Sequence, residues 1–314
     1  MRKLTRVLFV MVLLALMVPS LAQDEEAPVM GFWEECEDPS NLPETVNIGA
    51  IFVQSGNASV YGIVQTQAVE MAVAEINEAG YLGEGVELVV TFADSAGVAE
   101  QAIGAMESLL ESGVVAVLGP TLSTEAFSAD PIAQEAGVVV MGVSNTAGGI
   151  TDMGEFVFRD SLPEASVIPG TIATATEVLG LEQVAVLYGN DDDFTLSGYD
   201  VFITALEEND VEVLAEATFA RGDVDFSAQL TSLVATEPDA IVVSALAAEA
   251  TQIIVQARQA GYEGPIIGGN GLNSPAVLTG AGEASDGVIV GAAWNIASPE
   301  DLSALFAAAY EEAY

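Results

Sequence analysis

The residues best suited to chemistry follow two short apolar runs in the first half of the chain. Gly119-Pro120 stops the first run, and Ser123 and an acid then precede an alanine-rich segment. This order predicts a buried strand that leads directly into a helix N-terminus. The second run opens into the polar loop Ser144-Asn145-Thr146. Hydroxyl groups beside the free N–H groups of a helix N-terminus suit an anion such as a carboxylate, so the pattern indicates a ligand site.

Both loops are expected at one edge of a sheet, because the carboxyl ends of parallel strands meet there and form the usual ligand site of open α/β sheets. Two plainer interpretations stay open. Gly-Pro and Ser-Asn-Thr are also ordinary turn composition. Ser123 is also a good helix cap, a role that concerns stability and not binding.

The composition excludes most catalytic chemistry. The chain has no histidine and one cysteine, Cys36, so histidine bases, Ser-His-Asp triads and the usual zinc ligand sets are unavailable. No glycine-rich nucleotide motif follows a predicted strand. The run Asp191-Asp192-Asp193 lacks the spacing of a calcium loop and is predicted to be a solvated turn. We therefore expect no enzyme, cofactor or metal, with acid-only catalysis as the remaining enzymatic alternative.

The N-terminus has the pattern of an export signal. Three basic residues in the first six positions precede the apolar run Val7–Val18, and Ser20-Leu21-Ala22 supplies a cleavage site, so residues 1–22 are predicted to be a signal peptide. The apolar run is short for a membrane span, and no cysteine follows the cleavage site as a lipid anchor. We expect a periplasmic or secreted protein without stable membrane insertion, beginning with an acidic flexible leader at residues 23–45.

The charge is strongly negative. The chain has 47 acidic and 6 basic residues, and three of the basic residues belong to the predicted signal. Such a surface repels nucleic acid and anionic lipid. Its self-repulsion weakens as salt rises, which favours a saline habitat. An apolar content of 51% excludes general disorder and, at 314 residues, indicates two domains.

From Val46 onward, apolar strand patterns alternate with helical patterns, and the alternation restarts after Pro163. This spacing predicts an α/β fold of two Rossmann-like lobes, each with a parallel sheet covered by helices. The predicted lobes span residues 46–160 and 161–293, and residues 294–314 are predicted to cross back towards the first lobe. A cleft between two such lobes is a preferred ligand site.

The chain from Val46 to Tyr314 resembles a known family, the periplasmic solute-binding proteins of branched-chain amino acid ABC transporters. The resemblance rests on an ordered set of short motifs: Ile48-Gly49, Tyr61-Gly62, AVEMAVAEINEAG, Gly119-Pro120 with Ser123, AGVVVMGVSNT, Phe158-Arg159, Gly198-Tyr199, Asp225-Phe226, Pro238-Asp239-Ala240, QARQAG from Gln256 and Gly287-Val288. It implies a type I periplasmic binding protein, whose two lobes are joined by crossover strands and close by a hinge on a small zwitterion. The implied partners are a small-molecule ligand and the permease subunits of an ABC importer.

The resemblance also implies a ligand site. Ser123 and Thr146 match positions whose hydroxyls hold the ligand carboxylate, and Ser144 and Asn145 match positions that offer backbone groups. Tyr61 and Phe194 match aromatic residues that contact and close over the ligand, and Leu246 falls where a second aromatic residue is common.

Asn270 departs from the family pattern, because amino-acid binders often place an acid there against the ligand ammonium. An amide accepts a hydrogen bond but lacks the charge that strengthens such bonds. Amides, urea-like solutes and carboxylates therefore stay open as ligands beside amino acids, and an extracellular sensor module stays open beside an importer component. The resemblance further implies that the chain is C-terminally truncated within the helix that begins near Pro299.

Overall fold

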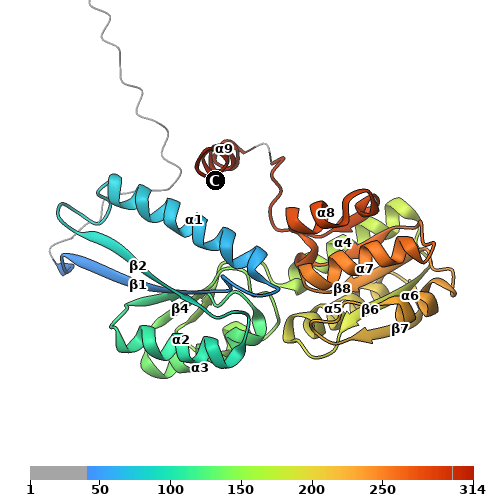
Figure 1. Cartoon of the computed structure of the whole chain (residues 1–314), viewed down its shortest axis with the longest axis horizontal. Helices are drawn as coiled ribbons and strands as arrows, with labels where there is room; N and C mark the ends of the chain where they lie inside the picture. Colours follow the sequence, from blue (N-terminus) through green and yellow to red (C-terminus); the bar gives the residue numbers. More distant parts are fainter. Residues whose placement is uncertain (1–40, 299) are drawn as a thin grey trace, which may run out of the picture.

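The computed structural model describes residues 41–298 and 300–314, which form two α/β lobes (Figure 1). The predicted signal peptide and most of the predicted leader lie outside the described residues. The predicted fold class is confirmed, because each lobe contains a five-stranded sheet in which every paired strand runs parallel to its neighbour. Within the described part of the chain, no helix has the length and apolar character needed to cross a membrane.

The first lobe contains a sheet with the strand order β2-β1-β3-β4-β5. Its strands are β1 (Thr45–Phe52), β2 (Glu87–Asp94), β3 (Ala116–Leu118), β4 (Val139–Gly142) and β5 (Val157–Arg159). Its helices are α1 (Ser59–Glu78), α2 (Ala99–Glu111), α3 (Ser123–Ala136) and the short 3-10 helix η2 (Ile150–Met153).

The second lobe contains a sheet with the strand order β10-β9-β8-β6-β7. Its strands are β6 (Gln183–Gly189), β7 (Glu212–Phe219), β8 (Ala240–Ser244), β9 (Ile266–Gly268) and β10 (Val288–Val290). Its helices are α4 (Glu164–Leu179), α5 (Asp193–Glu208), α6 (Ser227–Val234), α7 (Ala247–Gln259) and α8 (Pro275–Ala281), with 3-10 helices η3 (Asn270–Leu272) and η4 (Gly282–Ser285).

Apolar residues on alternate faces of the strands build the cores. In β6, Val184 and Val186 face a core formed with α4 and α5, whereas Ala185 and Leu187 face a second core formed with α6, α7 and α8. This period of two is what a sheet buried on both faces requires. In the first lobe, buried alanines of α2 and α3 pack with Met106 and Leu109 against the sheet. The rigid sheets therefore hold the loops at their carboxyl ends in fixed positions.

Two connections between the lobes lie in the part of the chain that the structure describes. The chain passes from β5 to α4 through residues 160–163, and after β10 it leads to helix α9 (Asp301–Ala313). Figure 1 shows α9 beside α1 of the first lobe. The Tyr314 hydroxyl donates to the Gln67 carbonyl oxygen at 3.3 Å, and the Tyr310 hydroxyl bonds the Gln67 side chain. The division into lobes at residues 160/161 and 293/294 stays a prediction.

Two helices begin three residues before the apolar pattern predicts. Helix α3 begins at Ser123 and not at Ala126, and α5 begins at Asp193 and not at Leu196. Both first turns consist largely of polar residues. Carboxylates accept the free backbone N–H groups there: Glu125 does so for α3 and Asp192 for α5. Helix α8, which the sequence pattern did not predict, begins with Pro275 after the capping side chain of Ser274.

Candidate functional site

Loops from the carboxyl ends of both sheets meet around one cavity between the lobes. Its lining is formed by Tyr61, Thr121, Leu122, Ser123, Ser144, Asn145, Phe194, Leu246, Asn270 and Gly271. Seven of the eight predicted ligand-binding residues are in this set, and Thr146 is the exception. The space open to the centre of a water molecule is about 40 Å³, which is enough for a few waters. Lining side chains must therefore move apart to admit a larger solute.

Ser123 lies at the first turn of α3 without acting as its cap. Leu122 occupies the N-cap position, and the Glu125 carboxylate accepts the Leu122 N–H at 3.0 Å. The Ser123 hydroxyl instead accepts the backbone N–H groups of Thr146 and Ala147, each at 3.2 Å. Because a hydroxyl both donates and accepts, Ser123 keeps a proton that it can donate to a ligand beside the positive end of the α3 dipole.

Ser144 belongs to a closed ring of hydrogen bonds within the first lobe. Its hydroxyl donates to the Thr121 carbonyl oxygen and accepts from Gln65 Nε2, both at 2.6 Å. The Thr121 hydroxyl donates to Gln65 Oε1 at 2.7 Å. The neighbouring Asn145 side chain donates to the Pro120 carbonyl oxygen at 2.9 Å. Gln65, which sequence reasoning missed, thus fixes the two loops against each other.

Thr146 lies behind the cavity and contacts a buried acid. Its hydroxyl donates to Glu164 Oε1 at 3.2 Å, and the Glu164 backbone N–H donates to the Thr146 carbonyl oxygen at 3.2 Å. Glu164 is 1% exposed, and burial raises its pKa to about 7 against the opposing effects of the Thr146 hydroxyl and the Asn270 backbone amide. No pattern in the sequence singles out Glu164, since it is one acid at a helix start in a very acidic chain.

The second lobe contributes the closing side of the cavity. Phe194 follows Asp192, whose carboxylate caps α5 by accepting the Phe194 and Thr195 N–H groups. Asn270 and Gly271 begin η3, directly after β9. A Cβ on Gly271 would lie 2.2 Å from the Ala245 carbonyl oxygen, so only glycine lets this turn approach β8 so closely.

The prediction that Asp191-Asp192-Asp193 forms a solvated turn is wrong at its central residue. Asp192 is 3% exposed and accepts a hydrogen bond from the Thr124 hydroxyl of the first lobe at 3.2 Å. Burial raises its pKa, and Arg221, 3.9 Å away, acts in the opposite direction. Asp192 therefore links the two lobes beside the cavity.

Tyr61 forms the most direct link between the lobes. From α1 in the first lobe, its hydroxyl donates to the Gly271 carbonyl oxygen at 2.6 Å and accepts the Ala247 N–H at 2.7 Å, both in the second lobe. Burial raises the pKa of this hydroxyl above its ordinary value. A Cβ on the next residue, Gly62, would lie 2.0 Å from the Val53 carbonyl oxygen, so this glycine lets α1 approach β1 and directs Tyr61 across the cleft.

An apolar cluster surrounds one side of the cavity and draws on both lobes. Val53, Ala58 and Leu122 come from the first lobe, and Phe194 and Leu246 come from the second, with Tyr61 packed against them. The cavity thus combines hydroxyl and amide groups on one side with aliphatic and aromatic side chains on the other. This arrangement suits a small solute with a polar head and an apolar tail.

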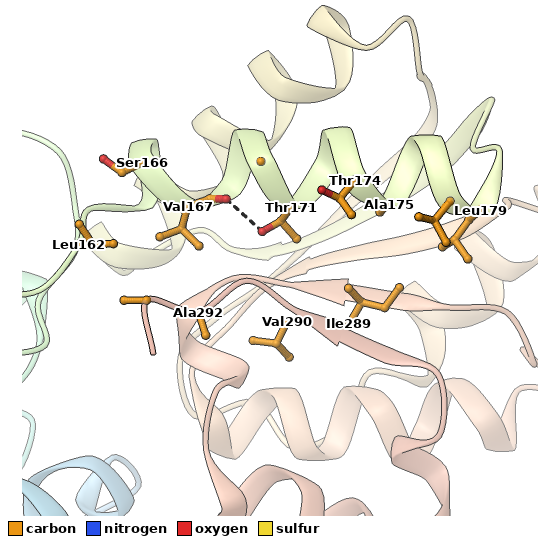
Figure 2. Close-up of a pocket in the computed structure, with 13 residues that line it drawn as sticks. Leu162, Ser166, Val167, Thr171, Thr174, Ala175, Leu179, Ile289, Val290 and Ala292 are labelled. Carbon is orange, nitrogen blue, oxygen red and sulfur yellow. Dashed lines mark hydrogen bonds between the residues drawn. The ribbon is translucent and has the colours of Figure 1, made fainter. Parts of the chain in front are cut away.

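A larger hollow lies on the second lobe, away from this cavity. Figure 2 shows it between α4 and β10, lined by aliphatic, alanine, serine and threonine side chains such as Val167, Thr171 and Ile289. It offers about 590 Å³ by the same measure but is an open groove, and none of its lining residues is charged. Most of its lining comes from α4 and β10 of one lobe, and it includes no amide or aromatic side chain, so the smaller cavity is the better candidate site.

Comparisons with known proteins agree with this geometry. A family model described as "Periplasmic binding protein" matches residues 45–314. The chain is similar to Leu/Ile/Val-binding protein homolog 3 of Brucella melitensis, with 25% identity over 73% of this chain and 62% of that protein. The chain therefore spans less than two thirds of this relative's length.

Two solved structures have the same fold. The branched-chain amino acid transporter substrate-binding protein LivJ of Streptococcus pneumoniae, in complex with isoleucine, has a TM-score of 0.79 and 29% identity, covering 86% of this chain and 77% of its own. A leucine-binding protein of Thermotoga maritima has a TM-score of 0.79 and 26% identity, covering 86% of this chain and 76% of its own.

Proposed function

Because the chain belongs to the periplasmic binding protein family, we propose that it is an extracytoplasmic substrate-binding protein that delivers an amino acid or a similar small polar solute to an ABC importer. Its partners are the ligand and the importer's permease subunits, and it performs no catalysis. The N-terminal pattern supports this location, because it has the features of a signal peptide.

The observation that carries the proposal is the two-sided cavity between the lobes. Ser123 at the start of α3 is suited to a carboxylate, and the apolar cluster around Phe194 and Leu246 is suited to an aliphatic side chain. A branched-chain amino acid has both features, and the names of the relatives in Brucella melitensis and Streptococcus pneumoniae refer to such ligands. We therefore propose leucine, isoleucine or valine as the first ligands to test.

Closure of the two lobes is proposed as the binding movement. The described structure is closed, because Tyr61, Thr124 and Gly148 of the first lobe each bond a group of the second lobe. Opening must break these contacts, and a bound solute adds contacts to both sides. Binding therefore shifts the population towards the closed form, which is the form a permease can distinguish from the open one.

A carboxylate solute without an amino group is the second candidate. It is favoured by Asn270, which lines the cavity with a neutral amide where amino-acid binders of this kind often carry an acid. The same amide keeps amides and urea-like solutes among the compounds to test, and sensing of such a solute is the alternative to its import.

Isothermal titration calorimetry of the chain tests the proposal. L-leucine, L-isoleucine and L-valine are titrated beside 4-methylpentanoate, 4-methylpentanamide and urea. Binding of an amino acid that is recovered unchanged supports the proposed function. Binding of the carboxylate without the amino acids supports the second candidate, and absence of binding to all six overturns the assignment of this cavity.

A further inference from the structure

The cavity has a suitable place for a carboxylate but no charged lining residue for an ammonium group. All ten lining residues are neutral in side chain, and Asn270 offers only an amide. A zwitterion that leaves water for such a site requires a negative charge near its amino group, because an unpaired buried ammonium is costly. The question is which acid of the described chain provides that charge.

Glu164 is the acid that the structure places behind this end of the cavity. It follows the crossover from the first lobe, its Oε1 accepts from Thr146, and its side chain lies against the loop that carries Asn270. A Cβ on Gly269 would lie 2.9 Å from Glu164 Oε2. This oxygen is buried and has no hydrogen-bond partner among the described residues. The acid is thus held between the two loops on either side of the cavity.

The other acids near the cavity are already engaged. Asp192 accepts from two backbone N–H groups and the Thr124 hydroxyl, and Arg221 is beside it. Glu249 accepts the Gly222 N–H at 2.8 Å, and Glu125 accepts the Leu122 N–H. These bonds hold Asp192 and Glu125 at the first turns of α5 and α3 and hold Glu249 against the loop at Gly222. Glu125 Oε1, like Glu164 Oε2, is buried without a hydrogen-bond partner among the described residues. Glu164 alone among them bonds a residue of the Ser144-Asn145-Thr146 loop.

We propose that Glu164 acts through Thr146 as the positioning residue that makes the cavity select solutes with an ammonium group. The Thr146 hydroxyl donates to this carboxylate, so it has no proton to offer the ligand carboxylate that the resemblance assigns to it. Once the lining side chains move apart to admit a solute, the hydroxyl instead presents its lone pairs to the ligand ammonium. The negative charge behind the hydroxyl strengthens that contact. The inference rests on the proposed function, since it assigns one end of the same cavity.

A proton is coupled to binding in this arrangement. Burial raises the pKa of Glu164 to about 7, so the unliganded protein holds a proton there below neutral pH. A nearby ammonium favours the charged carboxylate and lowers this pKa, and the proton is then released to solvent. The groups facing Glu164 are the Thr146 hydroxyl and the Asn270 backbone amide, both neutral. Of the charged residues nearest along the chain, Asp160 is exposed and Arg159 donates to the Ala147 carbonyl oxygen.

The test compares L-leucine with 4-methylpentanoate, which has the same carbon skeleton and carboxylate but no amino group. Calorimetry at pH 6 in two buffers of different ionisation enthalpy measures protons released per ligand. For the wild-type protein we expect release approaching one proton with L-leucine and none with 4-methylpentanoate. At pH 9 we expect no release with either compound.

Three variants separate this role from a structural one. Glu164→Gln is expected to weaken L-leucine binding by about tenfold to a hundredfold, to abolish proton release and to leave 4-methylpentanoate affinity unchanged. Glu164→Asp keeps the charge and should retain part of the leucine preference. Asp130→Asn is the matched control, because Asp130 is another buried acid with a raised pKa, in α3, and should leave proton release unchanged.

The outcomes distinguish the inference from the proposed function. If the wild type binds L-leucine without proton release and Glu164→Gln keeps the affinity and preference, the inference is overturned and the proposed function stands. If the wild type binds 4-methylpentanoate but no amino acid, the inference is overturned and the second candidate stands. If it binds none of the compounds, the proposed function itself fails. If Glu164→Gln does not fold, Thr146→Val takes its place, and retention of both proton release and the leucine preference in that variant overturns the inference.

Discussion

The Tyr61 hydroxyl donates to the Gly271 carbonyl oxygen across the cleft at 2.6 Å, so a residue of α1 holds the loop that presents Asn270. The same hydroxyl accepts the Ala247 N–H at the start of α7. Two contacts with the second lobe therefore depend on one oxygen atom of the first lobe. The closed form contains both contacts, and an open form loses them.

Removing this oxygen should weaken ligand binding without changing the chemistry of the site. Tyr61→Phe keeps the ring and loses two hydrogen bonds, each of which contributes about 0.5–1.5 kcal/mol. We expect affinity for the ligand to fall by about fivefold to a hundredfold, because closure becomes less favourable. Calorimetry measures the affinity, and small-angle scattering should show a larger mean radius of the unliganded variant. An unchanged affinity and radius would show that the bonds do not control closure.

Ser123→Ala should weaken carboxylate ligands by roughly tenfold to a hundredfold, because a hydrogen bond to a charged group contributes about 1.5–3 kcal/mol. The variant also frees the Thr146 and Ala147 N–H groups that the hydroxyl accepts. The loss for a matched neutral amide should be smaller. A variant with a lower melting temperature and unchanged affinity for both ligands would contradict a binding role for Ser123.

Asp130 is expected to destabilise the folded protein at neutral pH. It is 1% exposed, its Oδ1 has no partner in the described part of the chain, and burial raises its pKa to about 8. In the unfolded state this acid ionises near its ordinary value of 3.8. The folded state keeps the proton on Asp130 up to a higher pH than the unfolded state does. The free energy of unfolding therefore falls as the pH rises from about 4 to about 8.

Asp130→Asn removes this pH dependence. We expect the variant to be more stable than the wild type by roughly 2–4 kcal/mol at pH 7, with little difference at pH 4. Urea unfolding at both pH values measures the difference. Equal stabilities at pH 7 would mean that the buried carboxyl is satisfied in solution.

Salt should stabilise the protein. With 47 acidic and 6 basic residues, and one ion pair between side chains among residues 41–298 and 300–314, repulsion between acids dominates the surface electrostatics. The Debye length shortens from about 30 Å at 0.01 M to about 3 Å at 1 M salt, which screens this repulsion. Melting temperatures measured over this range of NaCl should rise. A flat or falling series would contradict this and with it the proposed saline habitat.

The sequence predicted the fold well where hydrophobic periodicity determines the element. The bounds of α4, Glu164–Leu179, and of β10, Val288–Val290, agree with the prediction because each is a continuous pattern between clear breakers. The starts of α3 and α5 were predicted too late because capping by Glu125 and Asp192 depends on side-chain contacts that periodicity does not contain. Helix α8 is too short to show a period.

The site was predictable as a set of loops but not as a set of contacts. Seven predicted residues line the cavity because parallel strands place their carboxyl ends together. Thr146 lies behind the cavity. Glu164 bonds Thr146, which is 18 residues away in the sequence, and Gln65 bonds Ser144, which is 79 residues away. Periodicity contains no information on such contacts. In so acidic a chain, neither the buried Glu164 nor the buried Asp192 differs in type from its many exposed neighbours.

We propose that the cavity between Ser123 and Asn270 binds a small solute with a carboxylate and an apolar tail. A crystal structure of the chain with L-leucine tests this binding mode. We expect leucine in this cavity, with its carboxylate at Ser123, its ammonium group at the Thr146 end and its side chain against Phe194 and Leu246. Leucine in the groove between α4 and β10, or a cavity that stays empty at saturating leucine, would contradict it.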